Sequence, residues 1–120
     1  MKPHQKLEVW KQSFEYVKKM YALTASFPQE EKYGLISQIR RASVSIPVNI
    51  AEGSARRSDK KLIQFLYIAL GSASEVDTLL LLSKDLGFLE SAICESSIVE
   101  LDSICKLLIG FINMVKRRVG

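Results

Sequence analysis

Apolar residues recur at steps of three and four along almost the whole of this sequence, which is the spacing of one face of an α-helix. The pattern is clearest from Ser91 to Lys116, where a heptad series runs from Cys94 to Val115. No stretch alternates apolar and polar residues in the way that a half-buried strand does. The sequence therefore predicts an all-α protein.

Three further segments show the same helical period. We expect helices over Lys6–Ser26 and Glu30–Ala55, and a third helix that has Ser58 as its N-cap and ends at Gly87. The turns between these segments are short, so the four helices are expected to form an antiparallel up-down-up-down bundle. At 120 residues the chain is expected to be a single domain, 1–120.

The second of these helices contains a proline. Pro47 removes one backbone hydrogen bond and crowds the preceding turn, at a cost of about 3 kcal/mol in an unadapted helix. The apolar steps nevertheless continue through it, so we expect a helix that is kinked at Pro47 and does not end there. The apolar line on its inward face is Leu35, Ile39, Ala42 and Ile46.

Several polar residues lie close to this inward face, and we expect them to form a partly buried network between the second and third helices. Arg40 or Arg41 would pair with Glu52 or Glu75 there, and such a network fixes the register of helices more than it adds stability. A ligand site at the same place is the alternative. The residues of the predicted network are Arg40, Arg41, Asn49, Glu52 and Glu75.

The sequence contains no pattern that indicates catalysis. Its one histidine, His4, lies near the N-terminus, and no phosphate-binding glycine loop or metal-ligand spacing is present. The segment Gly71–Ser74 lacks the second glycine of a nucleophile elbow. We therefore predict that the protein is not an enzyme, has no catalytic residues, and binds neither a cofactor nor a metal.

The two cysteines and the lengths of the apolar runs indicate the cellular compartment in which the protein is found. Cys94 and Cys105 are separated by roughly 16 Å if they lie in one helix, which is too far for a disulfide. Unpaired thiols are typical of the reducing cytoplasm. The N-terminus lacks the apolar segment of a signal peptide, and unbroken apolar runs such as Leu79–Leu82 are far too short to span a membrane. A cytoplasmic protein without membrane contact is expected.

The net charge of +4 is small, but the folded topology would separate charge along the bundle. The start of the first helix, the turn between the second and third helices, and the chain end would share one end, which we call the basic pole. Clustered Lys and Arg can bind RNA or DNA phosphates without sequence preference. A merely solubilising surface is the alternative. The basic pole consists of Lys2, Lys6, Arg56, Arg57, Lys60, Lys61, Lys116, Arg117 and Arg118, and the opposite end carries Glu30, Glu31, Asp85, Glu90 and Glu95.

The sequence resembles a family of small four-helix bundles that is named for proteins encoded in intervening sequences of bacterial 23S ribosomal RNA genes. The resemblance covers nearly the whole chain, although the last helix is similar only in its apolar pattern. The residues that carry it are Trp10, SFPQEEKYGL (Ser26–Leu35), QIRRASVSIPVNIAEG (Gln38–Gly53), ALGSASEVDTLLLL (Ala69–Leu82) and LGFL (Leu86–Leu89).

This resemblance implies a homopentamer of poorly defined function. Similar proteins are accessory factors of diversity-generating retroelements, in which a basic pentamer engages nucleic acid and a reverse transcriptase. The wide apolar faces of the helices indicate self-association by themselves, whereas the number five comes from the resemblance alone. We predict a non-catalytic homo-oligomer that binds nucleic acid through its basic pole. The alternative is a structural or protein-binding scaffold with no role in nucleic-acid binding.

Overall fold

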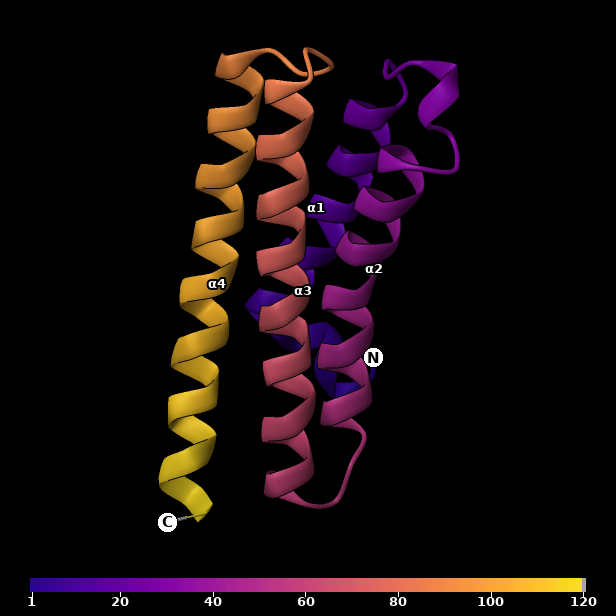
Figure 1. The fold of residues 1–120 in the computed structure, drawn as a ribbon. Helices are drawn as coiled ribbons and strands as arrows, with labels where there is room; N and C mark the ends of the chain where they lie inside the picture. The colour runs from indigo at the N-terminus through magenta and orange to yellow at the C-terminus, as the bar shows by residue number, and fades with distance from the viewer. Residues whose placement is uncertain (120) are drawn as a thin grey trace.

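The helical period of the sequence is realised in four long helices. The structure, a computed structural model, describes residues 1–119. The helices are α1 (Glu8–Thr24), α2 (Leu35–Ser54), α3 (Asp59–Asp85) and α4 (Ser91–Val119) (Figure 1). Two short 3-10 helices, η1 (Pro3–Lys6) and η2 (Gln29–Glu31), precede α1 and α2. No strand occurs among the described residues, so the predicted all-α class is confirmed.

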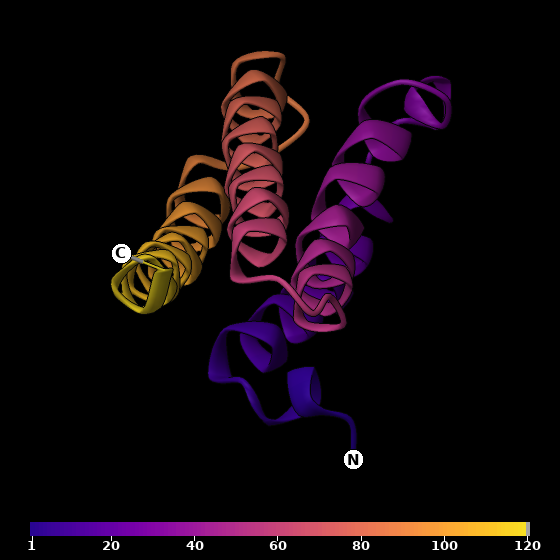
Figure 2. The same ribbon diagram turned by 90° about the horizontal axis from the view of Figure 1, so that it is seen from below.

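Each helix packs against its neighbours in the sequence. Contacts join α1 to α2, α2 to α3 and α3 to α4, while α4 touches α1 less extensively. The result is an elongated bundle with principal extents of 46 × 21 × 21 Å. Seen along the bundle, α1 and α2 lie on one side and α3 and α4 on the other (Figure 2). This arrangement confirms the predicted up-down-up-down bundle.

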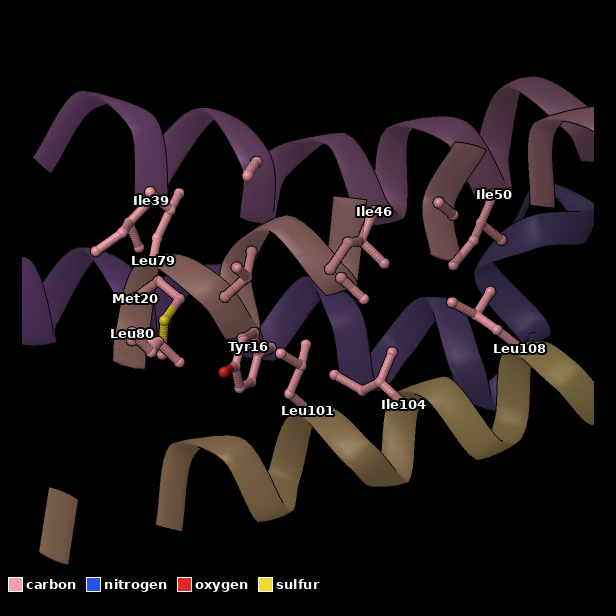
Figure 3. Close-up of a cluster of buried hydrophobic side chains, with 14 of the residues drawn as sticks. Tyr16, Met20, Ile39, Ile46, Ile50, Leu79, Leu80, Leu101, Ile104 and Leu108 are labelled. Carbon is pink, nitrogen blue, oxygen red and sulfur yellow. The ribbon is translucent and has the colours of Figure 1, made fainter. Parts of the chain in front are cut away.

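The core is built from one or two side chains per helical turn of every helix. Because these residues recur at steps of three and four, they form continuous rows that interdigitate along the bundle axis (Figure 3). On α1 the core row is Val9, Ser13, Tyr16, Met20 and Thr24, whereas the parallel row with Phe14 and Tyr21 is half-exposed. The fully buried large side chains include Tyr16, Met20, Ile39, Ile46, Ile50, Leu66, Leu80, Leu101, Ile104 and Leu108.

Local signals place the helix ends. Ser58 caps α3 as predicted, because its Oγ accepts the backbone N–H of Lys61 at 3.4 Å. Gly87 follows α3 with φ of +85°, a conformation that favours glycine. Two of the predicted helices begin later than expected, because Lys6 belongs to η1 and the Glu30–Glu31 pair belongs to η2.

The α2 helix runs without interruption through Pro47, as predicted, although the angle of the expected kink stays a prediction. Six residues later, at Gly53, α2 and α3 approach each other closely. A Cβ atom built on Gly53 would lie 2.8 Å from Cβ of Phe65 and 3.0 Å from Cδ1 of Leu62. The absence of a side chain at this position therefore allows α2 and α3 to pack closely before the turn that joins them.

Among the described residues, α3 alone has the length and mean hydropathy of a membrane-spanning helix. It also packs against both α2 and α4, and it carries the carboxylates of Glu75 and Asp77 in its apolar part. Core helices of soluble bundles have the same composition, because they bury a wide apolar face. Its apolar character is accounted for by the bundle core and by an exposed apolar row that is described below.

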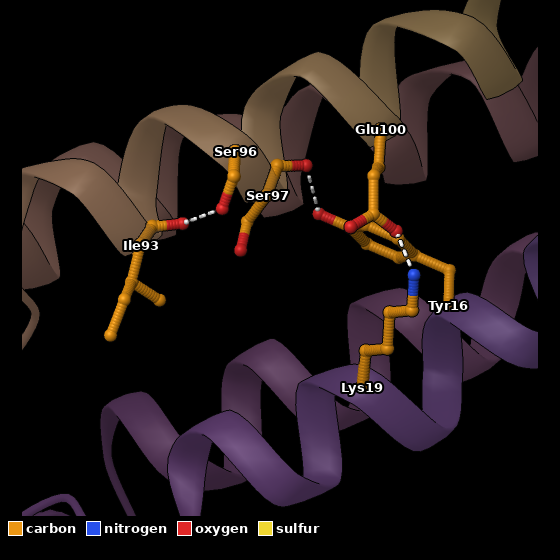
Figure 4. A network of polar contacts seen from close by, with 6 residues as sticks. All are labelled: Tyr16, Lys19, Ile93, Ser96, Ser97 and Glu100. Atoms are coloured by element: carbon orange, nitrogen blue, oxygen red, sulfur yellow. Dashed lines mark hydrogen bonds and ion pairs between the residues drawn. The ribbon is translucent and has the colours of Figure 1, made fainter.

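A buried tyrosine links the two helices that are furthest apart in the sequence. The hydroxyl of Tyr16 donates a hydrogen bond to the backbone carbonyl of Ser97, at 2.9 Å, and thereby connects α1 to α4 (Figure 4). An ion pair between Lys19 and Glu100 lies beside it at the surface. Burial, followed by the nearby carboxylates of Glu100 and Asp77, raises the pKa of the Tyr16 hydroxyl above its usual value.

Replacing Tyr16 with phenylalanine is expected to lower the free energy of unfolding by about 1 kcal/mol at neutral pH, because the buried hydrogen bond is lost. The raised pKa of Tyr16 also makes the stability of the wild type depend on pH in the alkaline range. Tyrosine ionises near pH 10 in the unfolded chain but retains its proton in the fold, so the wild type loses stability as the pH rises above about 10. Urea denaturation at pH 7 and pH 11 should therefore show a smaller alkaline loss in Tyr16→Phe, and an equal loss in both proteins would contradict this account.

Candidate nucleic-acid interface

The turn between α2 and α3 forms the centre of the basic pole. Arg56 and Arg57 lie in this turn, and Lys60 and Lys61 follow in the first turn of α3. All four side chains are exposed. The N-terminus of a helix carries a partial positive charge, which adds to that of the lysines. The turn thus presents a contiguous positive surface.

The end of α4 adjoins this turn. Arg118 Nη2 lies 3.2 Å from Asp59 Oδ1, and this contact ties the last turn of α4 to the first turn of α3. Figure 1 shows the end of α4 and the α2–α3 turn at the same end of the bundle. The structure therefore brings together basic residues that are about 60 positions apart in the sequence, as the up-down topology requires.

Three of the predicted basic residues already have partners within the chain. Besides Arg118, Arg56 pairs with Glu52 at 3.2 Å and lies over the ring of Phe65, 5.0 Å from its centroid. Lys116 Nζ donates to the hydroxyl of Tyr67 at 2.7 Å. These contacts are exposed, so they are weak and can be exchanged for phosphate, but they reduce the free charge of these three side chains.

The remaining cations of this end have no side-chain partner among the described residues, and we call them the free basic cluster. They are Arg57, Lys60, Lys61 and Arg117, and all are exposed. Unpaired, solvated cations need not break an existing ion pair in order to bind a phosphate. The free basic cluster is therefore the part of the basic pole that is best suited to this chemistry.

Lys2 and Lys6 lie apart from this cluster. Both are exposed, but they belong to the segment around η1, which packs beside α2. Figure 1 shows the N-terminus part of the way up the bundle, and Figure 2 shows it on a different side from the end of α4. The reason is that α1 is much shorter than α3 and α4, so its start does not reach the end of the bundle.

The predicted polar network is divided between two interfaces. Arg41 pairs with Glu75 of α3, as expected, but at the surface, with 62% and 38% of the two side chains exposed. Arg40 turns the other way, toward α1. Its Nε donates to Thr24 Oγ1 at 2.9 Å, its Nη2 donates to the carbonyl of Tyr21 at 3.2 Å, and the guanidinium lies over the Tyr21 ring. The predicted pairing of an arginine with Glu75 between α2 and α3 is therefore present, but it is exposed, and Arg40 belongs instead to the interface between α1 and α2.

Asn49 and Glu52, the other members of that prediction, have local partners. Asn49 donates to the carbonyl and the hydroxyl of Ser45, one turn earlier, and Ser72 of α3 donates to the same hydroxyl at 2.8 Å. Glu52 pairs with Arg56, which lies four residues later in the α2–α3 turn. Sequence reasoning missed the link between Ser45 and Ser72, although small polar residues at facing positions of two helices are the signal for such a link.

The described residues contain no cluster of His, Cys, Asp or Glu that could hold a metal ion. Cys94 is buried, Cys105 is half-buried, and neither forms a disulfide, as predicted.

The carboxylates of the opposite pole include Glu31, whose side chain accepts the backbone N–H of Leu35 at the start of α2. That end of the bundle offers no comparable cationic surface, so the free basic cluster is the candidate site.

These observations define a class of protein, namely an antiparallel four-helix bundle with a cationic surface at one end. Residues 5–110 match the family described as 23S rRNA-intervening sequence protein, and the chain belongs to this family. A crystal structure of a protein of unknown function from the S23 ribosomal protein family of Bacteroides thetaiotaomicron is similar, with a TM-score of 0.78 and 28% sequence identity over 87% of this chain and 97% of that chain. No curated protein matches the sequence.

Proposed function

We propose that this protein is a non-catalytic homo-oligomer, a pentamer as the resemblance of its sequence implies, that binds nucleic acid in the cytoplasm. The free basic cluster would contact the phosphates of RNA or DNA, with Arg56, Lys116 and Arg118 as secondary contacts and Lys2 and Lys6 outside the main surface. A reverse transcriptase or another protein would be a further partner of the complex. No cofactor, metal or membrane takes part in this function.

The observation that carries the proposal is the convergence of unpaired cations from two helix ends. Arg57 comes from the α2–α3 turn, Lys60 and Lys61 come from the first turn of α3, and the contact of Arg118 with Asp59 holds the last turn of α4, which carries Arg117, at the same end of the bundle. Such an array releases counterions from nucleic acid, which gives affinity without sequence preference. No described aromatic ring lies free among these cations, since Phe65 and Tyr67 are covered by Arg56 and Lys116. Phosphate contact is therefore favoured over base stacking.

The test compares two triple variants that lose the same charge. Arg57→Ala/Lys60→Ala/Lys61→Ala removes cations from the free basic cluster, while Lys11→Ala/Lys32→Ala/Lys106→Ala removes exposed cations elsewhere on the bundle. Titration of a labelled duplex and a single strand should show an affinity loss of roughly tenfold or more for the first variant and a small loss for the second. The salt dependence should also become shallower, by about 0.9 in the log–log slope for each lost duplex phosphate contact.

Two results would contradict the proposal. One is an absence of binding by the wild type at low salt. The other is an equal loss of affinity in both triple variants, which would show that only the net charge matters. Either result would leave the protein-binding scaffold as the remaining function. Light scattering of the same samples checks that the variants keep the mass of the wild type, so that a change in affinity is not a change in assembly.

A further inference from the structure

An apolar groove runs along the side of the bundle between α1 and α2. Its volume is about 350 Å³, and its walls come from the outward row of α1 and the facing row of α2. The ring of Trp10 is stacked on Phe14, with centroids 4.9 Å apart, and Val48 on the opposite wall is 50% exposed. The remaining lining residues are His4, Val17, Lys18, Val44, Pro47 and Ala51.

The charged side chains at the margin of this groove are mainly cationic. Lys18 lines it, and Arg40, one helical turn before Val44, is held over Tyr21 without a carboxylate partner among the described residues. Of the nearby carboxylates, Glu15 pairs with Lys18 at 3.0 Å in an exposed contact on the same helix, and Glu52, one turn after Val48, pairs with Arg56. The α1–α2 groove is therefore an apolar surface with a net positive margin.

The opposite side of the bundle carries a second apolar surface, which we call the α3–α4 face. On α3 it is a row with steps of four and three that includes Tyr67, Leu70 and Leu81. On α4 the matching row includes Ile98, Cys105 and Ile109. The hydrogen bond between Lys116 and Tyr67 shows that the two rows adjoin. Tyr67, Leu81 and Ile109 are 46%, 42% and 47% exposed, so a large part of this face is open to solvent in the single chain.

Carboxylates belong to these two rows. Asp77 lies seven residues after Leu70 and four before Leu81, and Asp102 lies between Ile98 and Cys105 at helical steps. Both are close to the same thiol: burial, followed by the carboxylates of Asp102 and Asp77, raises the pKa of Cys105. The α3–α4 face is therefore an apolar surface with an acidic centre.

The two surfaces have opposite charge at the same height along the bundle. Arg41 of α2 pairs with Glu75 of α3, which places Arg40 level with the part of α3 that contains Asp77. Two copies side by side and pointing the same way would thus bring the cations of one groove next to the carboxylates of the other copy's face. Copies pointing in opposite directions would not align these charges. Complementary charge of this kind selects one orientation.

We propose that the α1–α2 groove of each copy receives the α3–α4 face of a second copy in the same orientation. This inference rests on the self-association in the proposed function and assigns the two surfaces that form it. The contact is heterologous, because two different surfaces meet, and heterologous contacts close into a ring when the rotation between copies permits. All copies in such a ring would present the free basic cluster on the same side, so their contacts with nucleic acid would act together.

The test uses one variant for each surface. Val48→Glu places a carboxylate in the groove, and Ile109→Lys places a cation on the opposite face; both positions are exposed in the isolated chain, so each variant should fold. Each variant alone should have the 13.5 kDa mass of the monomer by light scattering. An equimolar mixture should form a dimer of twice that mass, because the intact groove of Ile109→Lys can still receive the intact face of Val48→Glu.

A matched control is Ile68→Glu, at an exposed position of α3 that belongs to neither surface, and it should keep the wild-type mass. Circular dichroism confirms that all three variants keep their helical content. If the wild type is itself a monomer, the self-association in the proposed function fails together with this inference. If the wild type is an oligomer and Val48→Glu and Ile109→Lys leave its mass unchanged, or if their mixture stays monomeric, only the assignment of these surfaces is overturned.

Discussion

Replacing Leu66 with alanine is expected to lower the free energy of unfolding by about 2–5 kcal/mol. Leu66 lies in the core row of α3 and has no exposed surface. Removing its branched side chain loses the free energy of burying those carbons and leaves a cavity, because well-packed neighbours close it only in part. Urea denaturation followed by circular dichroism measures the change directly.

Leu82→Ala is the matched control for this prediction. It makes the same substitution in the same helix, but Leu82 is 45% exposed and lies outside the core rows. We expect a loss of less than about 1 kcal/mol, because the wild-type side chain is only partly removed from water. Both variants should be compared at one protein concentration, since self-association adds to the apparent stability. Similar losses at the two positions would show that the core rows are assigned wrongly.

The second prediction concerns two glycines that should respond to alanine in opposite directions. In Gly53→Ala the new Cβ would lie 2.8 Å from Cβ of Phe65, an atom that cannot move without its backbone. The helices α2 and α3 would have to separate near their connecting turn, which is expected to lower the free energy of unfolding by about 1–3 kcal/mol. The gain in helix propensity from alanine is smaller than this loss.

In Gly71→Ala the same change meets no atom within 4 Å. Gly71 is exposed and lies in the middle of α3, so alanine should raise the free energy of unfolding by about 0.5–1 kcal/mol. Thermal unfolding should therefore show a lower Tm than the wild type for Gly53→Ala and a higher Tm for Gly71→Ala. A stabilised Gly53→Ala would show that α2 and α3 are not in close contact there. A destabilised Gly71→Ala would show that another helix approaches α3 at that point.

Most of the fold could be predicted because its signals are local. A serine before the first apolar turn and a glycine after the last one place the ends of α3, at Ser58 and Gly87, without any knowledge of the tertiary structure. The core rows of α2 and α4 are set by steps of three and four in the sequence. On α1, two such rows lie side by side, and only the packing of α2 and α4 decides that the row with Tyr16 and Met20 is the buried one.

The candidate site was harder to predict, because it depends on the directions in which neighbouring side chains point and on the length of α1. Neighbouring residues of a helix point about 100° apart, so Arg40 and Arg41 cannot both face α3, and the sequence does not say which one does. The structure turns Arg41 to Glu75 and Arg40 to the carbonyl of Tyr21, a backbone group that no residue pattern reveals. The position of Lys2 and Lys6 away from the end of the bundle follows from the short α1, whose start was predicted two residues too early.

The packing of each helix against its neighbours in the sequence also bears on how the chain folds. Contacts between residues that are close in the sequence need little loop closure, and domains built mainly from them fold within microseconds to milliseconds. The pairs α1–α2, α2–α3 and α3–α4 can therefore form one after another as the chain leaves the ribosome. The hydrogen bond from Tyr16 to Ser97 joins residues 81 positions apart, so α1 acquires its second neighbour only after the first turns of α4 have been synthesised.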